Sequence, residues 1–203
     1  MSPLNAWLYL DRMELSRYWP VNAEMKWEDF SSQYEDGTIS VNDFGFLSLN
    51  KKQAFNLALD AASYLPVIPT VDVPRPIPTE LVGLNDPDEN SLVLVTANNS
   101  FTFEVISTIW AQGITPAWFL LIDCGGNTLD MAMVFKKFTP QALQEAIQTT
   151  ELASKVSHRN LLMPGLASPL KDEFELATGW KTEVGPICAA EIPLFLDARW
   201  IFP

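Results

Sequence analysis

Cysteine, histidine and positive charge are scarce in this chain. Its 203 residues include two cysteines and one histidine, and 13 Lys and Arg stand against 25 Asp and Glu. Two thiols are too few for a disulfide scaffold, a four-thiolate zinc site or a four-cysteine iron-sulfur cluster. The formal net charge of −12 would repel a phosphate backbone. We therefore expect no nucleic-acid partner.

Long apolar runs and nucleotide-binding signatures are also missing. Charged residues or prolines interrupt every apolar run before it reaches about 18 residues, and no basic segment followed by an apolar one opens the sequence. Neither G-x-G-x-x-G nor G-x-x-x-x-G-K-[ST] occurs. These absences predict a cytoplasmic protein that has no membrane partner and binds no dinucleotide.

Prolines and turn residues divide the chain into two parts. The first part is rich in aromatic and acidic residues, and an apolar stripe predicts one helix over residues 50–65. A proline-rich, extended connector over residues 66–78 is expected to lie along the surface. The turn-rich segment 85–90 marks the predicted boundary. We expect an irregular or α+β region over residues 1–87 and a second domain over residues 88–203.

Apolar runs and helical patterns alternate after Asn90. The predicted strands are 92–95, 118–122, 161–163 and 181–184. The predicted helices are Thr102–Trp110, a helix that starts at Thr139-Pro140, Pro169–Thr178 and Ala189–Leu196. Four strands, each followed by a loop and a helix, predict a Rossmann-like α/β fold with a parallel sheet and helices on both faces.

The loops that follow the four strands form the candidate site, because open α/β sheets bind ligands at the carboxyl ends of their strands. These loops are rich in Gly, Asn, Ser and Thr, and none of them carries a Lys or Arg. Glycines let the backbone approach a bulky ligand, and the neutral side chains offer hydrogen bonds. Such loops are ordinary turns more often than sites. Their chemistry disfavours a phosphate-rich ligand and favours a large ligand with neutral amides, such as a corrinoid.

A series of short motifs in one order points to a known family. The motifs are Leu92–Asn98, Asp123–Leu129, Lys137–Thr139, Lys155–His158, Met163–Gly165, Thr178–Trp180, Val184–Pro186 and Ile192–Leu196. Together they make residues 88–196 resemble the C-terminal corrinoid domain of the large subunit of the corrinoid iron-sulfur protein, which serves acetyl-CoA synthase. The mercury-methylating corrinoid protein shares this domain. The iron-sulfur and barrel domains of the first relative have no counterpart here.

The resemblance implies a cobalamin or another corrinoid, held with its lower base displaced, whose cobalt cycles between a reduced and a methylated state. It implies no catalytic side chain, because the methyl chemistry belongs to the cofactor. The implied cofactor-binding residues are Thr96, Asn98, Ser100, Cys124, Gly125, Gly126, Asn127, Thr128, Leu129, Met131, Ala132, Pro164, Gly165, Leu166, Ala167, Gly185, Pro186 and Ile187.

Extended without gaps from Asp123, the resemblance implies that Met131 stands where a cysteine of the mercury-methylating relative approaches the cobalt. A thioether is a much weaker metal ligand than a thiolate, so packing under the ring is favoured over a direct cobalt contact. The lone His158 precedes the third predicted strand, at the end away from the ligand loops. It is predicted to make a structural hydrogen bond.

The leading hypothesis is a corrinoid-binding protein that carries a methyl group or presents the cofactor to a partner methyltransferase. The chain would then be at most a carrier component of an enzyme system, and the aromatic N-terminal half would dock a protein partner. The alternative is a non-catalytic sensor, storage or protein-interaction module derived from the same domain. A flavin-binding domain is disfavoured, because the first loop lacks a run of Ser, Thr and Gly suited to a phosphate.

Overall fold

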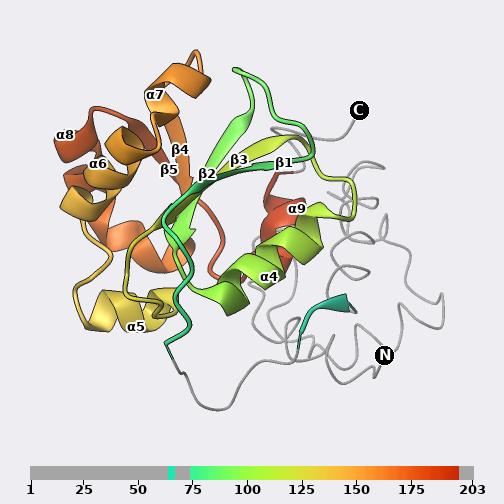
Figure 1. The fold of residues 1–203 in the computed structure, drawn as a ribbon, viewed down its shortest axis with the longest axis horizontal. Helices are drawn as coiled ribbons and strands as arrows, with labels where there is room; N and C mark the ends of the chain where they lie inside the picture. Colours follow the sequence, from blue (N-terminus) through green and yellow to red (C-terminus); the bar gives the residue numbers. More distant parts are fainter. Residues whose placement is uncertain (1–63, 67–73, 197–203) are drawn as a thin grey trace, which may run out of the picture.

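The computed structural model describes residues 64–66 and 74–196 of the chain. Strands and helices alternate along these residues. They form an α/β fold in which helices cover both faces of one sheet, as predicted (Figure 1). The helix predicted over residues 50–65 lies outside the described residues, apart from Tyr64 and Leu65.

Five strands form the sheet, in the spatial order β1-β3-β2-β4-β5. They are β1 (Leu81–Leu84), β2 (Leu92–Ala97), β3 (Ala117–Ile122), β4 (Asn160–Met163) and β5 (Lys181–Val184). β2 pairs in parallel with β3 and β4, and β4 pairs in parallel with β5. β1 runs antiparallel to β3, with Leu81 opposite Leu120. The four predicted strands are confirmed, but the sheet is mixed rather than wholly parallel.

β1 and β2 differ in burial because they occupy different places in the sheet. Every residue of β2 is buried, as expected for a central strand with helices on both faces. β1 lies at the edge and is mostly half-buried, and Gly83 within it is exposed. β1 also lies ahead of residue 88, the predicted start of the second domain. That division of the chain stays a prediction.

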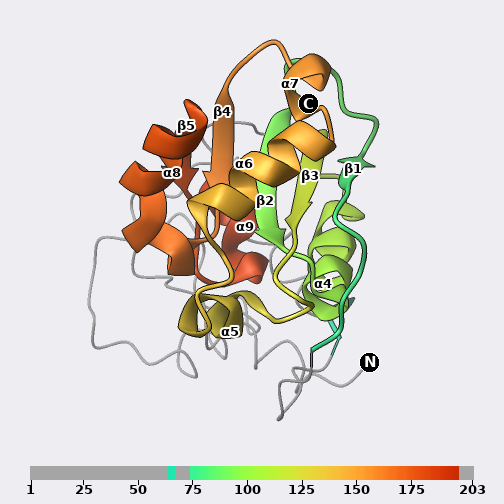
Figure 2. The ribbon, with the colours of Figure 1, turned by 60° about the vertical axis from the view of Figure 1, so that its left-hand side comes forward.

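The helices form two layers. α4 (Ser100–Trp110) and α9 (Ile192–Leu196) pack on one face of the sheet, whereas α6 (Pro140–Thr149) and α8 (Lys171–Thr178) pack on the other (Figure 2). The other helices are α5 (Leu129–Val134), α7 (Leu152–Lys155), and the 3₁₀ helices η3 (Gly165–Leu170) and η4 (Ala189–Glu191).

The helix starts follow from their capping residues. The Asn99 side chain accepts hydrogen bonds from the N–H groups of Phe101 and Thr102, so α4 begins at Ser100 rather than at the predicted Thr102. Thr139 caps α6 and Pro140 occupies its first position, as predicted.

Two predicted helices are each divided into a 3₁₀ helix and an α-helix. Pro169–Thr178 consists of the end of η3 followed by α8, and Ala189–Leu196 consists of η4 followed by α9. Pro169 lies inside η3, and a proline has no N–H for the hydrogen bond of a helix interior. The α-helix therefore starts after the proline.

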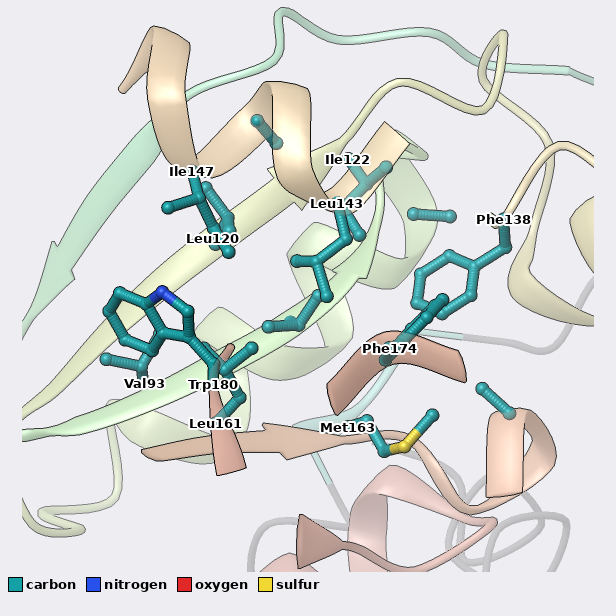
Figure 3. Close-up of a cluster of buried hydrophobic side chains, with 14 of the residues drawn as sticks. Val93, Leu120, Ile122, Phe138, Leu143, Ile147, Leu161, Met163, Phe174 and Trp180 are labelled. Carbon is teal, nitrogen blue, oxygen red and sulfur yellow. The ribbon is translucent and has the colours of Figure 1, made fainter. Parts of the chain in front are cut away.

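Each face of the sheet has its own hydrophobic core. Leu92 and Leu94 of β2 pack in the core that contains α4 and α9, whereas Val93 and Val95 pack in the core that contains α6 and α8. Successive side chains of a strand point to opposite faces, which explains this division. Figure 3 shows the second core, where side chains of α6 lie over β3.

Candidate functional site

A cavity of about 530 Å³ lies at the carboxyl ends of β2 and β4. The chain leaves β2 through α4 toward β3 on one side, and it returns from β3 through α6 to β4 on the other side. Open α/β sheets bind ligands at such a switch point between neighbouring strands. The volume lies within the roughly 300 to 1,000 Å³ of ligand pockets. The position and size of the cavity therefore make it the candidate site.

The cavity brings together part of the predicted site. The predicted residues that line it are Thr96, Thr128, Leu129, Pro164, Leu166, Gly185, Pro186 and Ile187. They come from the ends of β2, β4 and β5, from η3 and from the start of α5. The predicted residues outside the lining are Asn98, Ser100, Cys124, Gly125, Gly126, Asn127, Met131, Ala132, Gly165 and Ala167.

Several apolar side chains line the cavity that were not predicted from the sequence as site residues. Phe101 and Ile106 of α4, Phe119 of β3, and Ala189 and Ile192 around α9 line it. In the sequence, the apolar residues of α4 that line the cavity cannot be distinguished from those that pack in an ordinary core. The alternation along β2 was the available signal, because it places Leu94 and Thr96 on the face that α4 covers.

The lining is mainly apolar, and none of the described residues that form it is a lysine or arginine. Its acidic member is Asp130 in the first turn of α5, which is exposed. The Thr128 hydroxyl donates a short hydrogen bond to the Asp130 carboxylate. The cavity therefore offers apolar contact and a few oxygen acceptors at one edge. Its described lining residues offer no cation for a phosphate.

The start of α4 is not available to a phosphate either. The N–H of Ser100 donates to the carbonyl oxygen of Arg75, and the next two N–H groups donate to the Asn99 side chain. Free N–H groups at a helix start are what bind the phosphates of nucleotides and flavins. This arrangement disfavours a flavin, in line with the expectation from the first loop.

The side chain of Asn98 is fully engaged within the protein. Its oxygen accepts from the N–H of Cys124 at 2.7 Å and from the N–H of Gly126 at 3.2 Å. Its nitrogen donates to the carbonyl oxygen of Ile77 at 2.9 Å and to the Asp123 carboxylate at 3.2 Å. An asparagine side chain has two acceptor sites and two donors, so none remains for a ligand.

Residues 75–77, the described part of the predicted connector that contacts the sheet, lie next to these loops. The carbonyl oxygen of Gly126 accepts from the N–H of Arg75 at 2.7 Å. A Cβ atom on Gly126 would overlap the backbone of Pro76. Residues 75–77 pair with the loops like an extended segment, as predicted, whereas residues 67–73 of the connector lie outside the described residues. The small size of Gly126 serves contact with Pro76.

Leu129 and Asp130 of α5 line the cavity, whereas Met131 does not. Met131 is half-buried, and Ala132 is buried in the core on the α6 face. The predicted packing of Met131 under a corrinoid ring, which is favoured over a direct cobalt contact, stays a prediction.

Cys124 also belongs to the core on the α6 face and is buried. Burial, and to a lesser degree the Asp123 carboxylate, raise the pKa of its thiol to about 12 against a lowering effect of Lys137. A thiol with such a pKa is neutral and unreactive at physiological pH.

His158 makes the structural hydrogen bond that its isolation predicts. Its Nδ1 accepts from the N–H of Asn160 at 3.2 Å, so the proton of the neutral ring lies on Nε2. Nε2 lies 3.0 Å from the carbonyl oxygen of Ser91 and donates to it. Asn160 starts β4 and Ser91 precedes β2, so the ring lies at the end of the sheet away from the cavity.

Within residues 64–66 and 74–196, no group of three or more His, Cys, Asp or Glu side chains is placed to hold a metal ion. Over that same part of the chain, none of the helices combines the length and the apolar character needed to cross a bilayer.

Sequence comparison finds relatives that are named as subunits of acetyl-CoA decarbonylase/synthase complexes. It is similar to acetyl-CoA decarbonylase/synthase complex subunit gamma of Methanopyrus kandleri, with 37% identity over 124 residues, which are 61% of this chain and 27% of the relative. The protein of that name from Methanocaldococcus jannaschii is 31% identical over 127 residues, which are 63% of this chain and 26% of the relative. The one from Archaeoglobus fulgidus is 32% identical over 120 residues, which are 59% of this chain and 26% of the relative. The match thus spans about a quarter of these relatives.

The family model that matches residues 58–196 describes the delta subunit of CO dehydrogenase/acetyl-CoA synthase. The expected assignment to the large subunit of the corrinoid iron-sulfur protein is therefore wrong, although the acetyl-CoA pathway is supported by the names of the relatives. The short motifs that suggested it lie mostly in strand ends and turns, which are weak marks of one family within a pathway. The chain belongs to the CO dehydrogenase/acetyl-CoA synthase delta subunit family.

Proposed function

We propose that this chain binds a corrinoid in the cavity at the ends of β2 and β4 and serves methyl transfer in an acetyl-CoA decarbonylase/synthase type of complex. The observation that carries the proposal is a mainly apolar cavity at the switch point of the sheet, whose described lining residues include no lysine or arginine. Acetyl-CoA consists of a methyl, a carbonyl and a CoA group. A complex that makes or cleaves it must therefore handle a methyl group.

The described residues fit a corrinoid in their chemistry. Phe101, Ile106 and Ile192 provide apolar surface, which suits the faces of a macrocycle. Thr96, Thr128 and Asp130 provide oxygen atoms, which can accept hydrogen bonds from amide groups on the rim. When bound, the corrinoid would supply the cobalt that carries the methyl group. The chain itself would bind and orient the ring and limit its access to water.

The surroundings of the cavity favour a protein partner in the same assembly. Leu166 and Ile187 line the cavity and are also exposed. Val134 and Phe135 are exposed at the end of α5, which packs against η3. Exposed apolar side chains that gather at one place often mark a contact with another protein. The names of the relatives, as subunits of a complex, agree with such a role.

Retention of hydroxocobalamin tests the proposal. The full chain, mixed with hydroxocobalamin and passed through gel filtration, should retain it with the yellow spectrum of a cobalamin whose lower base is displaced. Absence of retained absorbance would reject the proposal.

A cavity-filling variant and a matched control test whether hydroxocobalamin binds in this cavity. Ala189 lines the cavity, whereas Ala153 of α7 is exposed and lies outside its lining. Ala189→Trp should abolish retention because the indole fills the space, and Ala153→Trp should leave it unchanged. Equal retention by both variants would show that the ligand binds outside this cavity.

The alternative function is a sensor, storage or protein-interaction module, and the exposed apolar residues beside the cavity favour a contact role. Methylation of the bound cofactor separates the two functions. If the chain retains cobalamin but its reduced form accepts a methyl group from no supplied donor, the carrier role fails.

A further inference from the structure

Residues Arg75–Ile77, here called the strap, lie across the carboxyl ends of β2 and β3. The N–H of Ile77 donates to the carbonyl oxygen of Asn98 at 3.1 Å, and the carbonyl oxygen of Arg75 accepts from Ser100 at 2.9 Å. Pro76 forms an antiparallel bridge with Asn99. The strap therefore pairs with the loop after β2 much as a short strand would.

Asn98 joins the strap to the second loop, residues 123–128. One side-chain nitrogen bonds both Ile77 and Asp123, while the side-chain oxygen holds the N–H groups of Cys124 and Gly126. Asn98 is buried, with 4% of its surface exposed. A buried N–H that loses its acceptor finds no water to replace it, so removal of this side chain leaves unsatisfied groups on both segments.

The next residue, Asn99, extends this link to α4. Its side-chain nitrogen donates to the carbonyl oxygen of Gly126 at 2.6 Å, while its oxygen caps the helix. Phe101 of α4 and Thr128 at the end of the second loop both line the cavity. The starts of α4 and α5 are thus both fixed to the strap through two adjacent asparagines.

We propose that Asn98 is a positioning residue that, with the strap, sets the distance between the α4 and α5 walls of the cavity. It acts through the second loop and has no donor or acceptor left for the ligand. The inference deepens the proposed function and rests on it for its consequence in corrinoid binding. The mechanical link itself is testable in the chain without any ligand.

Hydrogen exchange measures the link directly. Asn98→Ala should speed amide exchange in peptides that cover residues 124–134 by about tenfold or more, because two buried N–H groups lose their acceptor. The matched control is Asn85→Ala. Asn85 also donates two side-chain hydrogen bonds, to the carbonyl oxygens of Trp110 and Ile114 at the other end of the sheet. Unchanged exchange over residues 124–134 in Asn98→Ala would overturn the proposal.

Two neighbouring glycines provide a second pair of variants in case Asn98→Ala fails to fold. Gly125 and Gly126 both have positive φ, 64° and 73°, so alanine strains the backbone at either position. A Cβ on Gly126 would meet the backbone of Pro76, whereas one on Gly125 would lie 2.8 Å from the flexible end of Lys137. Gly126→Ala should release the strap and speed exchange in residues 75–77 more than Gly125→Ala does. Equal exchange in this pair would also count against the link.

Hydroxocobalamin binding separates the two proposals. If the unaltered chain retains cobalamin, Asn98→Ala should weaken the binding by about tenfold or more, while Asn85→Ala leaves it unchanged even where it lowers Tm. Equal affinity of Asn98→Ala and the unaltered chain would overturn the positioning role and leave the proposed function intact. If the unaltered chain retains no cobalamin, the proposed function fails, and the exchange measurements still decide whether Asn98 holds the two walls.

Discussion

The rings of Phe138 and Phe174 lie with their centroids 5.4 Å apart and their planes tilted by 48° (Figure 3). Both side chains are buried, and they join the segment after α5 to α8 on one face of the sheet. Tilted aromatic pairs at this separation contribute stability beyond the area that they bury.

Phe174→Ala should lower the free energy of unfolding by about 3 to 5 kcal/mol, because it removes this contact and leaves a cavity in the core. Urea unfolding followed by circular dichroism measures the loss. Leu176→Ala on the same helix is the control, since Leu176 is 89% exposed and its truncation should change stability by no more than about 0.5 kcal/mol. Similar losses in both variants would contradict the burial described for α8.

The capping residues of α4 and α6 should contribute different amounts to the free energy of unfolding. Thr139→Ala removes one capping hydrogen bond, to the N–H of Ala142, and should cost about 1 kcal/mol. Asn99→Ala removes the α4 cap and also the hydrogen bond to Gly126, so we expect about 2 to 3 kcal/mol. Urea midpoints of the two variants provide the comparison. An equal cost would show that the link to Gly126 adds nothing.

Cys124 should make the stability of the chain fall at alkaline pH. Its thiol pKa is raised from 9.0 to about 12 on folding, so only the unfolded chain loses this proton between those values. The free energy of unfolding then falls by about 1.4 kcal/mol per pH unit through this group. Its contribution is fully present below pH 9.0 and is lost as the pH rises toward about 12.

Cys124→Ala isolates this effect, because the other titrating groups are common to both chains. The stability difference between the unaltered chain and the variant should shrink as the pH rises from 8 to about 11. Thiol labelling with peptide mapping gives an independent measurement, and Cys124 should react only after denaturant is added. Rapid labelling of the native chain at pH 8 would contradict the buried position.

The contribution of the turn before β2 to stability should fall at acidic pH. The Ser91 hydroxyl donates to the Asp88 carboxylate at 2.7 Å and the N–H of Asn90 donates at 2.9 Å, which together hold the pKa of Asp88 below its ordinary value. Ser91→Ala should raise that pKa toward the ordinary value, as measured by an NMR titration of the carboxyl carbon. The lowered pKa of Asp88 stabilises the folded chain at pH values above the ordinary pKa of this carboxyl. This stabilisation is lost as the pH falls through the pKa of Asp88 in the folded chain. A pKa unchanged by Ser91→Ala would exclude this bond.

The sequence predicted β2, β3 and β4 because helices cover these strands on both faces, so each contains a wholly apolar run, over residues 92–95, 118–122 and 161–163. β1 gave no such signal, since Leu81–Leu84 is a short edge strand that contains Gly83 and is only partly buried. Its place depends on pairing with β3, which lies more than thirty residues later in the chain. A contact of that kind leaves no local pattern in one sequence.

The candidate site shows the same limit. The loops rich in glycine and asparagine lie at the carboxyl ends of the strands, as predicted, but Asn98 and Gly126 contact the strap. Their composition is what a ligand site needs and also what close contact between two backbone segments needs. The prolines indicated that residues 74–78 are extended, and only the fold shows where they lie.

The antiparallel pairing of β1 has a practical consequence for shortened versions of the chain. A fragment that starts at Asp88 would lose both the strap and β1, and the outer edge of β3 would be left with unpaired N–H and C=O groups. Open edges of this kind recruit strands from other molecules. Such a fragment would self-associate in solution, whereas one that starts ahead of Pro74 would keep its edge closed.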